Sequence, residues 1–143
     1  MTPQILAPAA ILVLWSLIML FWTAAGRVSA ASRMKIDMPN PVGGRGQDLD
    51  LLLPPSVAWK SHNYTHLMEQ PTIFYPTVVI LALVGAGTGL NLALAWGYVG
   101  LRIIHSLYQA LINKVAVRLP IFLASTACLI ILAINAIIAT ISL

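Results

Sequence analysis

Two long stretches of the chain, residues 5–26 and 119–143, contain no Lys, Arg, Asp, Glu or His. A helix rises about 1.5 Å per residue, so about 20 apolar residues cross the hydrocarbon core of a membrane. A cleaved signal peptide is the alternative for the first run, but such a peptide carries basic residues before a shorter apolar stretch of about 7–15 residues. Here the first basic residue, Arg27, follows the run. Both runs therefore predict transmembrane helices.

Two further helices are expected between these runs. Ser56 follows Pro54-Pro55 and can cap a helix that enters the membrane near Glu69. Pro71 and Pro76 each remove a backbone donor inside this helix, so we expect a bend there. The glycine-rich stretch 85–89 then predicts a tight turn into another apolar run. The expected helices cover approximately residues 5–27, 57–86, 90–113 and 118–142.

Composition agrees with a protein surrounded by lipid. Hydrophobic residues make up 59% of the 143 residues and charged residues only 8%, whereas a soluble domain has about 25% charged residues. The 8 Lys and Arg are few and lie mostly near the ends of the apolar segments, which excludes a basic patch for nucleic acid. The sequence predicts an all-α membrane protein: one domain over residues 1–143, folded as a bundle of four transmembrane helices.

The distribution of basic residues predicts the orientation. A polar loop over about residues 29–55 is rich in Pro, Gly and Asp, and a short polar link joins the last two helices. Basic residues concentrate in and beside the loop and in the link, while the N-terminus, the glycine turn and the C-terminus have none. The residues are Arg33, Lys35, Arg45, Lys60, Lys114 and Arg118. The positive-inside rule places both connections in the cytoplasm and both termini outside.

Ionisable residues inside the apolar segments are the candidates for function. Arg102 lies deep in the third helix, where an unpaired cation costs several kcal/mol. Glu69 is the carboxylate nearest the membrane, so we expect these two side chains to form an ion pair. His105 lies three residues after Arg102 and shares its helix face. Arg118, at the start of the fourth helix, either snorkels to the interface or turns inward.

Other reactive side chains carry less information. His62 and His66 are four residues apart at a solvated helix start, but the sequence offers no third ligand, so we expect no metal site. Cys128 has no other cysteine to pair with and lies in an apolar run, where we interpret it as a packing residue.

Two segments resemble a known family. They are His66-Leu-Met-Glu69-Gln-Pro71-Thr-Ile-Phe-Tyr and Ala95-Trp-Gly-Tyr-Val-Gly-Leu-Arg102-Ile-Ile-His105-Ser, continued by Asn113-Lys-Val and Arg118. Polar residues spaced in this way within apolar helices resemble the MAPEG family, the membrane-associated proteins of eicosanoid and glutathione metabolism, and in particular a bacterial branch of it. The likeness covers roughly residues 60–130.

The resemblance implies a homotrimer in the bacterial inner membrane that holds glutathione between adjacent subunits near the cytoplasmic side. By position, Arg118 matches the family's catalytic arginine, which stabilises the glutathione thiolate. The family's tyrosine near the end of the helix-three motif stands one residue earlier here, as Tyr108. The residues implied to bind glutathione are Glu69, Arg102, His105, His66, Asn63 and Tyr108.

Three functions are compatible with these features. The resemblance favours a glutathione-dependent transferase or peroxidase that acts on a lipophilic electrophile entering from the bilayer. A non-catalytic scaffold, or a partner subunit of a larger complex, would keep a buried Glu69–Arg102 pair simply because removing one partner leaves an unpaired charge. A small transporter would need polar residues along a continuous route, and the first and last helices supply no ionisable group for one.

Overall fold

The computed structural model of the protein describes residues 4–142, and every regular element within that range is helical. This confirms the expectation of an all-helical protein. The elements are α1 (Leu6–Met34), a short 3-10 helix η1 (Gly46–Leu51), α2 (Pro55–Glu69), α3 (Pro71–Leu83), α4 (Gly89–Leu111) and α5 (Val115–Ile141).

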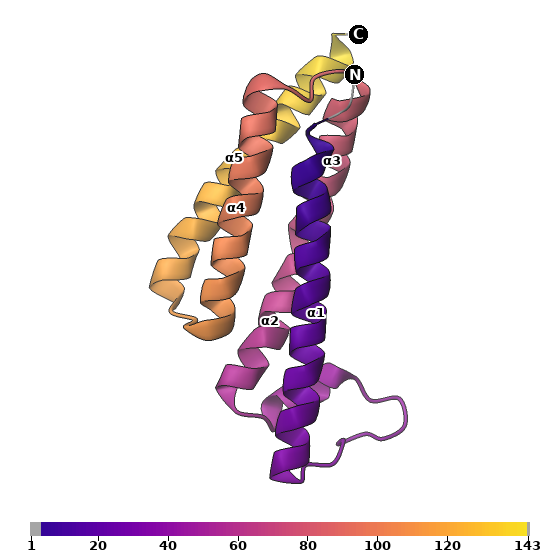
Figure 1. The fold of residues 1–143 in the computed structure, drawn as a ribbon, viewed down its shortest axis with the longest axis vertical. Coiled ribbons are helices and arrows are strands. Elements are labelled where there is room, and N and C mark those ends of the chain that lie inside the picture. Colours follow the sequence, from indigo (N-terminus) through magenta and orange to yellow (C-terminus); the bar gives the residue numbers. More distant parts are fainter. Residues whose placement is uncertain (1–3, 143) are drawn as a thin grey trace.

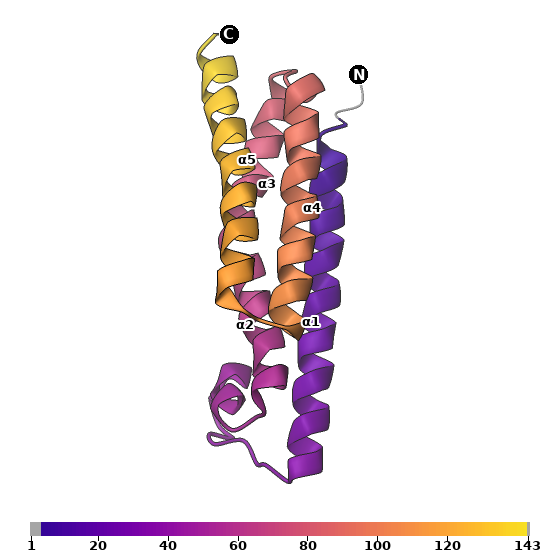
Figure 2. The same ribbon diagram turned by 90° about the vertical axis from the view of Figure 1, so that its left-hand side faces the viewer.

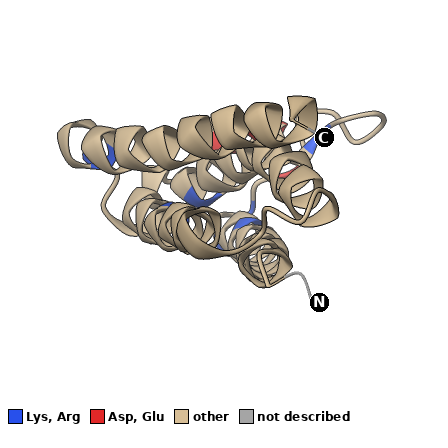
Figure 3. Ribbon diagram, turned by 90° about the horizontal axis from the view of Figure 1, so that it is seen from above, with Lys and Arg blue, Asp and Glu red and all other residues tan. Residues whose placement is uncertain are grey.

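The helices run roughly alongside one another, and the molecule is elongated (Figures 1 and 2). The start of α1 and the end of α5 lie at one end together with the α3–α4 turn, and the loop between α1 and α2 lies at the opposite end. Helix α4 packs mainly against α5, and also against α2 and α1. Seen along the long axis, the charged positions are sparse on the helices (Figure 3). The α2, α4 and α5 contacts bring together the helices that carry the polar motifs.

Two helices, α1 and α5, are long and apolar enough to cross a membrane. Large apolar side chains along both are exposed, as expected where lipid replaces water; Phe21 of α1, for example, is 71% exposed. The other two expected spans differ from these. Polar side chains lower the mean hydropathy of α4, and the segment expected as one helix over residues 57–86 is divided into α2 and α3.

The division between α2 and α3 occurs at Gln70-Pro71. Gln70 keeps helical dihedral angles (φ −61°, ψ −39°), so the two helices lie end to end, while Pro71 removes a backbone donor at the junction. The Gln70 side chain ties this point to the rest of the molecule. Its Nε2 donates to Thr126 Oγ1 over 2.9 Å, and its Oε1 accepts from the Tyr98 hydroxyl over 3.4 Å. The junction is therefore anchored to both α4 and α5.

An apolar core joins α1, α3, α4 and α5 at the end that carries the termini. Phe74 of α3 stacks on Tyr98 of α4, with ring centroids 4.3 Å apart. Leucine, valine and methionine side chains surround this pair and are buried: Leu12, Met19, Val78, Leu81, Val99, Leu129 and Leu132. Gly85 and Gly89 both have positive φ (74° and 57°), which allows the chain to reverse between α3 and α4.

Candidate functional site

A hollow of about 190 Å³ lies between α2, α4 and α5, near the link that joins α4 to α5. Three residues singled out from the sequence meet there, one from each helix. The lining residues are His66, His105, Val115, Arg118, Leu119 and Phe122. A larger hollow of about 410 Å³ between α3 and α5 is lined by Thr77, Ile80, Ala133, Ala136, Ile137, Thr140 and Ile141. It contains no ionisable group, whereas the smaller hollow brings an arginine and two histidines together.

Arg118 is held at the start of α5 by the link before it. Its Nη1 donates to Asn113 Oδ1 over 2.8 Å, and its backbone N–H donates to the Lys114 carbonyl in the first turn. Asn113 has a positive φ of 57°, a conformation that asparagine tolerates better than most residues. The link therefore directs the guanidinium toward the hollow, and Arg118 turns inward.

The two histidines form a parallel pair across the α2–α4 contact. Their ring centroids are 6.1 Å apart and the planes differ by 6°. Phe122 of α5 lies against His105 at 5.9 Å with a tilt of 52°. His105 is 2% exposed, whereas His66 is half-buried and its ring reaches the hollow more openly. Aromatic packing from three helices thus fixes the orientation of both rings.

Arg102 lies directly behind this pair and is 1% exposed. Its Nη2 donates to the His66 carbonyl oxygen over 3.0 Å, and its guanidinium carbon lies 5.4 Å from the centre of the Phe122 ring. Its Nε and Nη1 are buried and have no hydrogen-bond partner among the described residues. The last carbonyls of a helix carry partial negative charge. The C-terminal end of α2 therefore provides the local partner for this cation.

The expected ion pair between Glu69 and Arg102 is wrong. Within residues 4–142 the only ion pair joins Arg27 to Asp50, and the Glu69 side chain is exposed. The Glu69 backbone carbonyl instead accepts from the Thr72 hydroxyl over 2.5 Å. The position of Glu69 on α2 directs its side chain outward, and the His66 carbonyl takes the place next to Arg102 that we assigned to a carboxylate.

The remaining predicted residues, Asn63 and Tyr108, are not among the described residues that line the hollow. Asn63 is 1% exposed, and neither atom of its amide has a partner among the described residues. Tyr108 is half-buried, and its backbone carbonyl accepts from Ile112 and Asn113 as α4 ends. Asn63 belongs to the same buried face of α2 as Leu67. Tyr108 lies nearer the α4–α5 link than the histidine pair.

The sequence reasoning missed Phe122 and Gln109. Phe122 follows Arg118 by four residues, and Gln109 follows His105 by four, so helical spacing could have identified both. Gln109 is 1% exposed and its Oε1 has no partner in the described part of the chain. Like Arg102, it has a buried polar atom that no described residue satisfies.

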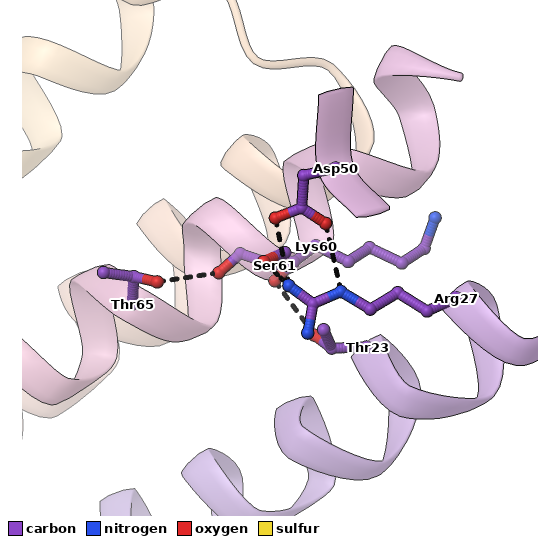
Figure 4. Close-up of polar contacts among 6 residues, drawn as sticks. All are labelled: Thr23, Arg27, Asp50, Lys60, Ser61 and Thr65. Atoms are coloured by element: carbon purple, nitrogen blue, oxygen red, sulfur yellow. Dashed lines mark hydrogen bonds and ion pairs between the residues drawn. The ribbon is translucent and has the colours of Figure 1, made fainter. Parts of the chain in front are cut away.

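A second polar cluster, also missed, lies where the long loop returns to the helices (Figure 4). Arg27 Nε and Nη2 donate to the two carboxylate oxygens of Asp50, each over 3.0 Å. Arg27 Nη2 also contacts Ser61 Oγ, and Thr23 donates to the Lys60 carbonyl over 3.0 Å. Such a two-point pair is geometrically specific. It ties η1 and the loop to both α1 and α2.

The hollow can bind and stabilise an anion. Arg118 is cationic, the histidines are polar, and no carboxylate among residues 4–142 lines the space. In such surroundings a thiol is favoured as thiolate. Within the described residues, no group of three or more His, Cys, Asp or Glu is placed to hold a metal ion.

Comparisons with curated proteins and with solved structures found no significant match. A family model described as the MAPEG family matches residues 5–138, a range that includes the hollow, Arg27, Arg102, α1 and most of α5. Because that match covers nearly the whole sequence, the chain is a membrane protein that belongs to the MAPEG family.

Proposed function

We propose that the protein is a glutathione-dependent transferase or peroxidase that acts on lipophilic electrophiles at the membrane. The observation that carries the proposal is the convergence of Arg118, His66 and His105 on one hollow without a carboxylate. A negatively charged sulfur bound there would meet only cationic, imidazole or apolar groups. Glutathione supplies such a sulfur when its thiol ionises.

Arg118 is the proposed catalytic residue. A guanidinium close to a thiol favours the charged form, so it raises the fraction of nucleophilic thiolate at neutral pH. Asn113 uses one guanidinium nitrogen, Nη1, and the described residues make no hydrogen bond to the others. Those donors are available to the sulfur of glutathione.

We further propose that His66, His105 and Arg102 form the inner wall of the glutathione site and that Asn63 and Tyr108 border it. Buried polar groups without partners cost free energy unless something satisfies them. The unpaired amide of Asn63 and the free donors of Arg102 are of this kind. Glutathione is rich in amides and carboxylates, and its polar atoms would complement both. Glu69, exposed on the adjacent surface, would contact the ligand only from the rim.

The size of the hollow favours a site that a neighbouring subunit completes, as in the homotrimer that the resemblance to the family implies. Pockets for drug-sized ligands have volumes of about 300–1,000 Å³, whereas this hollow measures about 190 Å³. One subunit alone offers too little room for a tripeptide and an electrophile. A neighbouring subunit would complete the cleft, and the exposed apolar faces of the helices would pack against it or against membrane lipid.

For the membrane arrangement we propose four crossings, by α1, by α2 and α3 together, by α4 and by α5. The basic loops would face the cytoplasm of a bacterial inner membrane and both termini the periplasm. This places Arg118 near the cytoplasm, where glutathione is abundant. We expect a reporter that is active only in the periplasm to be active when it is fused after Leu143. If a reporter at this position is found in the cytoplasm, the proposed orientation is wrong.

The test of function is calorimetric titration of the detergent-purified protein with glutathione, followed by the ultraviolet absorbance of the bound thiolate. We expect saturable binding, appearance of thiolate at neutral pH, and transfer to a lipophilic aryl halide or reduction of a lipid hydroperoxide. Native mass spectrometry should give a trimer. A trimer that binds no glutathione and forms no thiolate would reject the enzyme and favour the non-catalytic scaffold.

A further inference from the structure

The hollow contains two groups able to accept a proton, and both are imidazoles. Its other lining residues are Arg118, which is already a cation, and the apolar side chains of Val115, Leu119 and Phe122. Glu69 lies outside the hollow and is exposed. A thiol that becomes a thiolate next to Arg118 must give up its proton. Within this space only His66 and His105 can take it.

The two histidines are not equivalent. His105 is 2% exposed and is covered by Phe122 on one side and by the His66 ring on the other. His66 is half-buried. Its Nδ1 is buried and has no hydrogen-bond partner among the described residues, so Nε2 is the ring nitrogen that a ligand in the hollow can reach. His66 is therefore the more exposed histidine and offers Nε2 to the hollow, and the ring of the buried His105 stacks against it.

We propose that His66 is a catalytic residue that accepts the thiol proton of glutathione on its Nε2 atom, an inference that rests on the function proposed above. The S–H bond breaks, the proton bonds to Nε2, and the electron pair remains on the sulfur beside Arg118. The positive imidazolium is then balanced by the negative thiolate. When the sulfur attacks an aryl halide, a C–S bond forms and halide leaves with its bonding pair. His66 then releases its proton to water.

Neighbouring groups position His66 for this step. Arg102 Nη2 donates to the His66 backbone carbonyl, which fixes the end of α2, and the stacked His105 ring fixes the side-chain plane. Arg102 and His105 are thus positioning residues. The charged and titratable groups around His66 are Arg102 and His105 on α4, Arg118 on α5, and Glu69 and His62 on α2 itself.

The test follows thiolate absorbance after rapid mixing of the purified protein with glutathione, from about pH 6 to about pH 9. His66→Gln keeps a polar side chain but cannot accept a proton. The matched control is His62→Gln, one helical turn earlier on α2 and exposed. Near pH 7 we expect thiolate formation in His66→Gln to be slower by about 100-fold, the low end for general-base catalysis. The His62→Gln rate should equal that of the wild type.

The pH profile distinguishes a proton acceptor from a packing residue. With His66 present, the rate should level off as the imidazole becomes fully neutral. In His66→Gln the rate should rise about tenfold per pH unit, because hydroxide has to take the proton. Equal rates and equal profiles in the two proteins would overturn the role of His66 while leaving the proposed function intact. If the wild-type rate of thiolate formation rises throughout the range from about pH 6 to about pH 9, the role of His66 is also overturned. This outcome does not depend on whether the variant folds. If the wild type forms no thiolate, the proposed function fails and this inference with it.

Discussion

Two arginines in this protein have opposite environments. Arg27 is paired through two nitrogens with the Asp50 carboxylate, and the two side chains are 18% and 9% exposed. Arg102 is 1% exposed, makes one hydrogen bond to a backbone carbonyl, and has two nitrogens without partners among the described residues. A cation whose charge is matched inside the chain maintains architecture. A buried cation with donors that no described residue satisfies has no such match inside the chain.

The regions around these two arginines also differ in what they connect. The Arg27 cluster closes the loop between α1 and α2 against the two helices, using residues distant in sequence. The Arg102 region lies behind a hollow that Arg118 faces from α5. We expect substitutions in the first region to change stability and substitutions in the second to change chemistry or binding.

The largest effect should come from Arg118→Ala. Loss of one preorganised hydrogen-bond donor that stabilises a negative charge lowers the rate of an enzymatic reaction by about 100-fold. Glutathione-dependent turnover should fall by about that factor, while the thermal midpoint in detergent should stay near that of the wild type. The control is Arg33→Ala, whose side chain is exposed at the end of α1. A large loss of thermal stability in Arg118→Ala, with turnover unchanged, would mean that Arg118 stabilises the fold and does not act in catalysis.

Asp50→Asn should have the next largest effect, and it should lower stability without changing glutathione binding. It leaves the half-buried Arg27 without a countercharge, and a hydrogen bond to a charged group contributes about 1.5–3 kcal/mol. We expect the free energy of unfolding to fall by about 2 kcal/mol, with glutathione binding unchanged. Asp37→Asn, an exposed loop carboxylate, is the control. Loss of glutathione binding without loss of stability would contradict the division between the two regions.

Arg102→Gln tests whether the free donors of Arg102 serve a ligand. If they do, calorimetry should give a glutathione affinity weaker by about tenfold, which corresponds to about 1.4 kcal/mol. Arg33→Gln should bind as the wild type does. Unchanged affinity together with dissociation of the oligomer would assign those donors to a neighbouring subunit instead.

The smallest effect should come from Glu69→Gln. Its side chain is exposed and pairs with no cation among residues 4–142, so the midpoint of thermal unfolding should differ little from that of Lys35→Gln. The free energy of unfolding of both variants should lie within about 0.5 kcal/mol of that of the wild type. A marked destabilisation by Glu69→Gln would contradict the exposed position of its side chain.

Local sequence features predicted much of this molecule. Charge-free runs predicted helices within α1 and α5, the two able to cross a membrane, although α1 continues beyond the expected end at residue 27 to Met34. The Arg102–His105 spacing predicted a shared helix face. Pro71 and Pro76 predicted a bend, and the helix is interrupted at Gln70-Pro71, with α2 and α3 end to end, while α3 continues through Pro76. These are consequences of helical periodicity and of backbone donors, which depend on neighbours in the chain.

The sequence alone determined an all-helical membrane protein and the resemblance to its family. Only the tertiary structure decided which charges meet. Arg27 pairs with Asp50 across a loop, and Arg102 contacts the carbonyl of His66 instead of the Glu69 carboxylate three residues further along. The physical reason is that a hydrogen bond depends on which faces of two helices approach and at what register. Composition and spacing along one helix contain no information about the rotation of its neighbour.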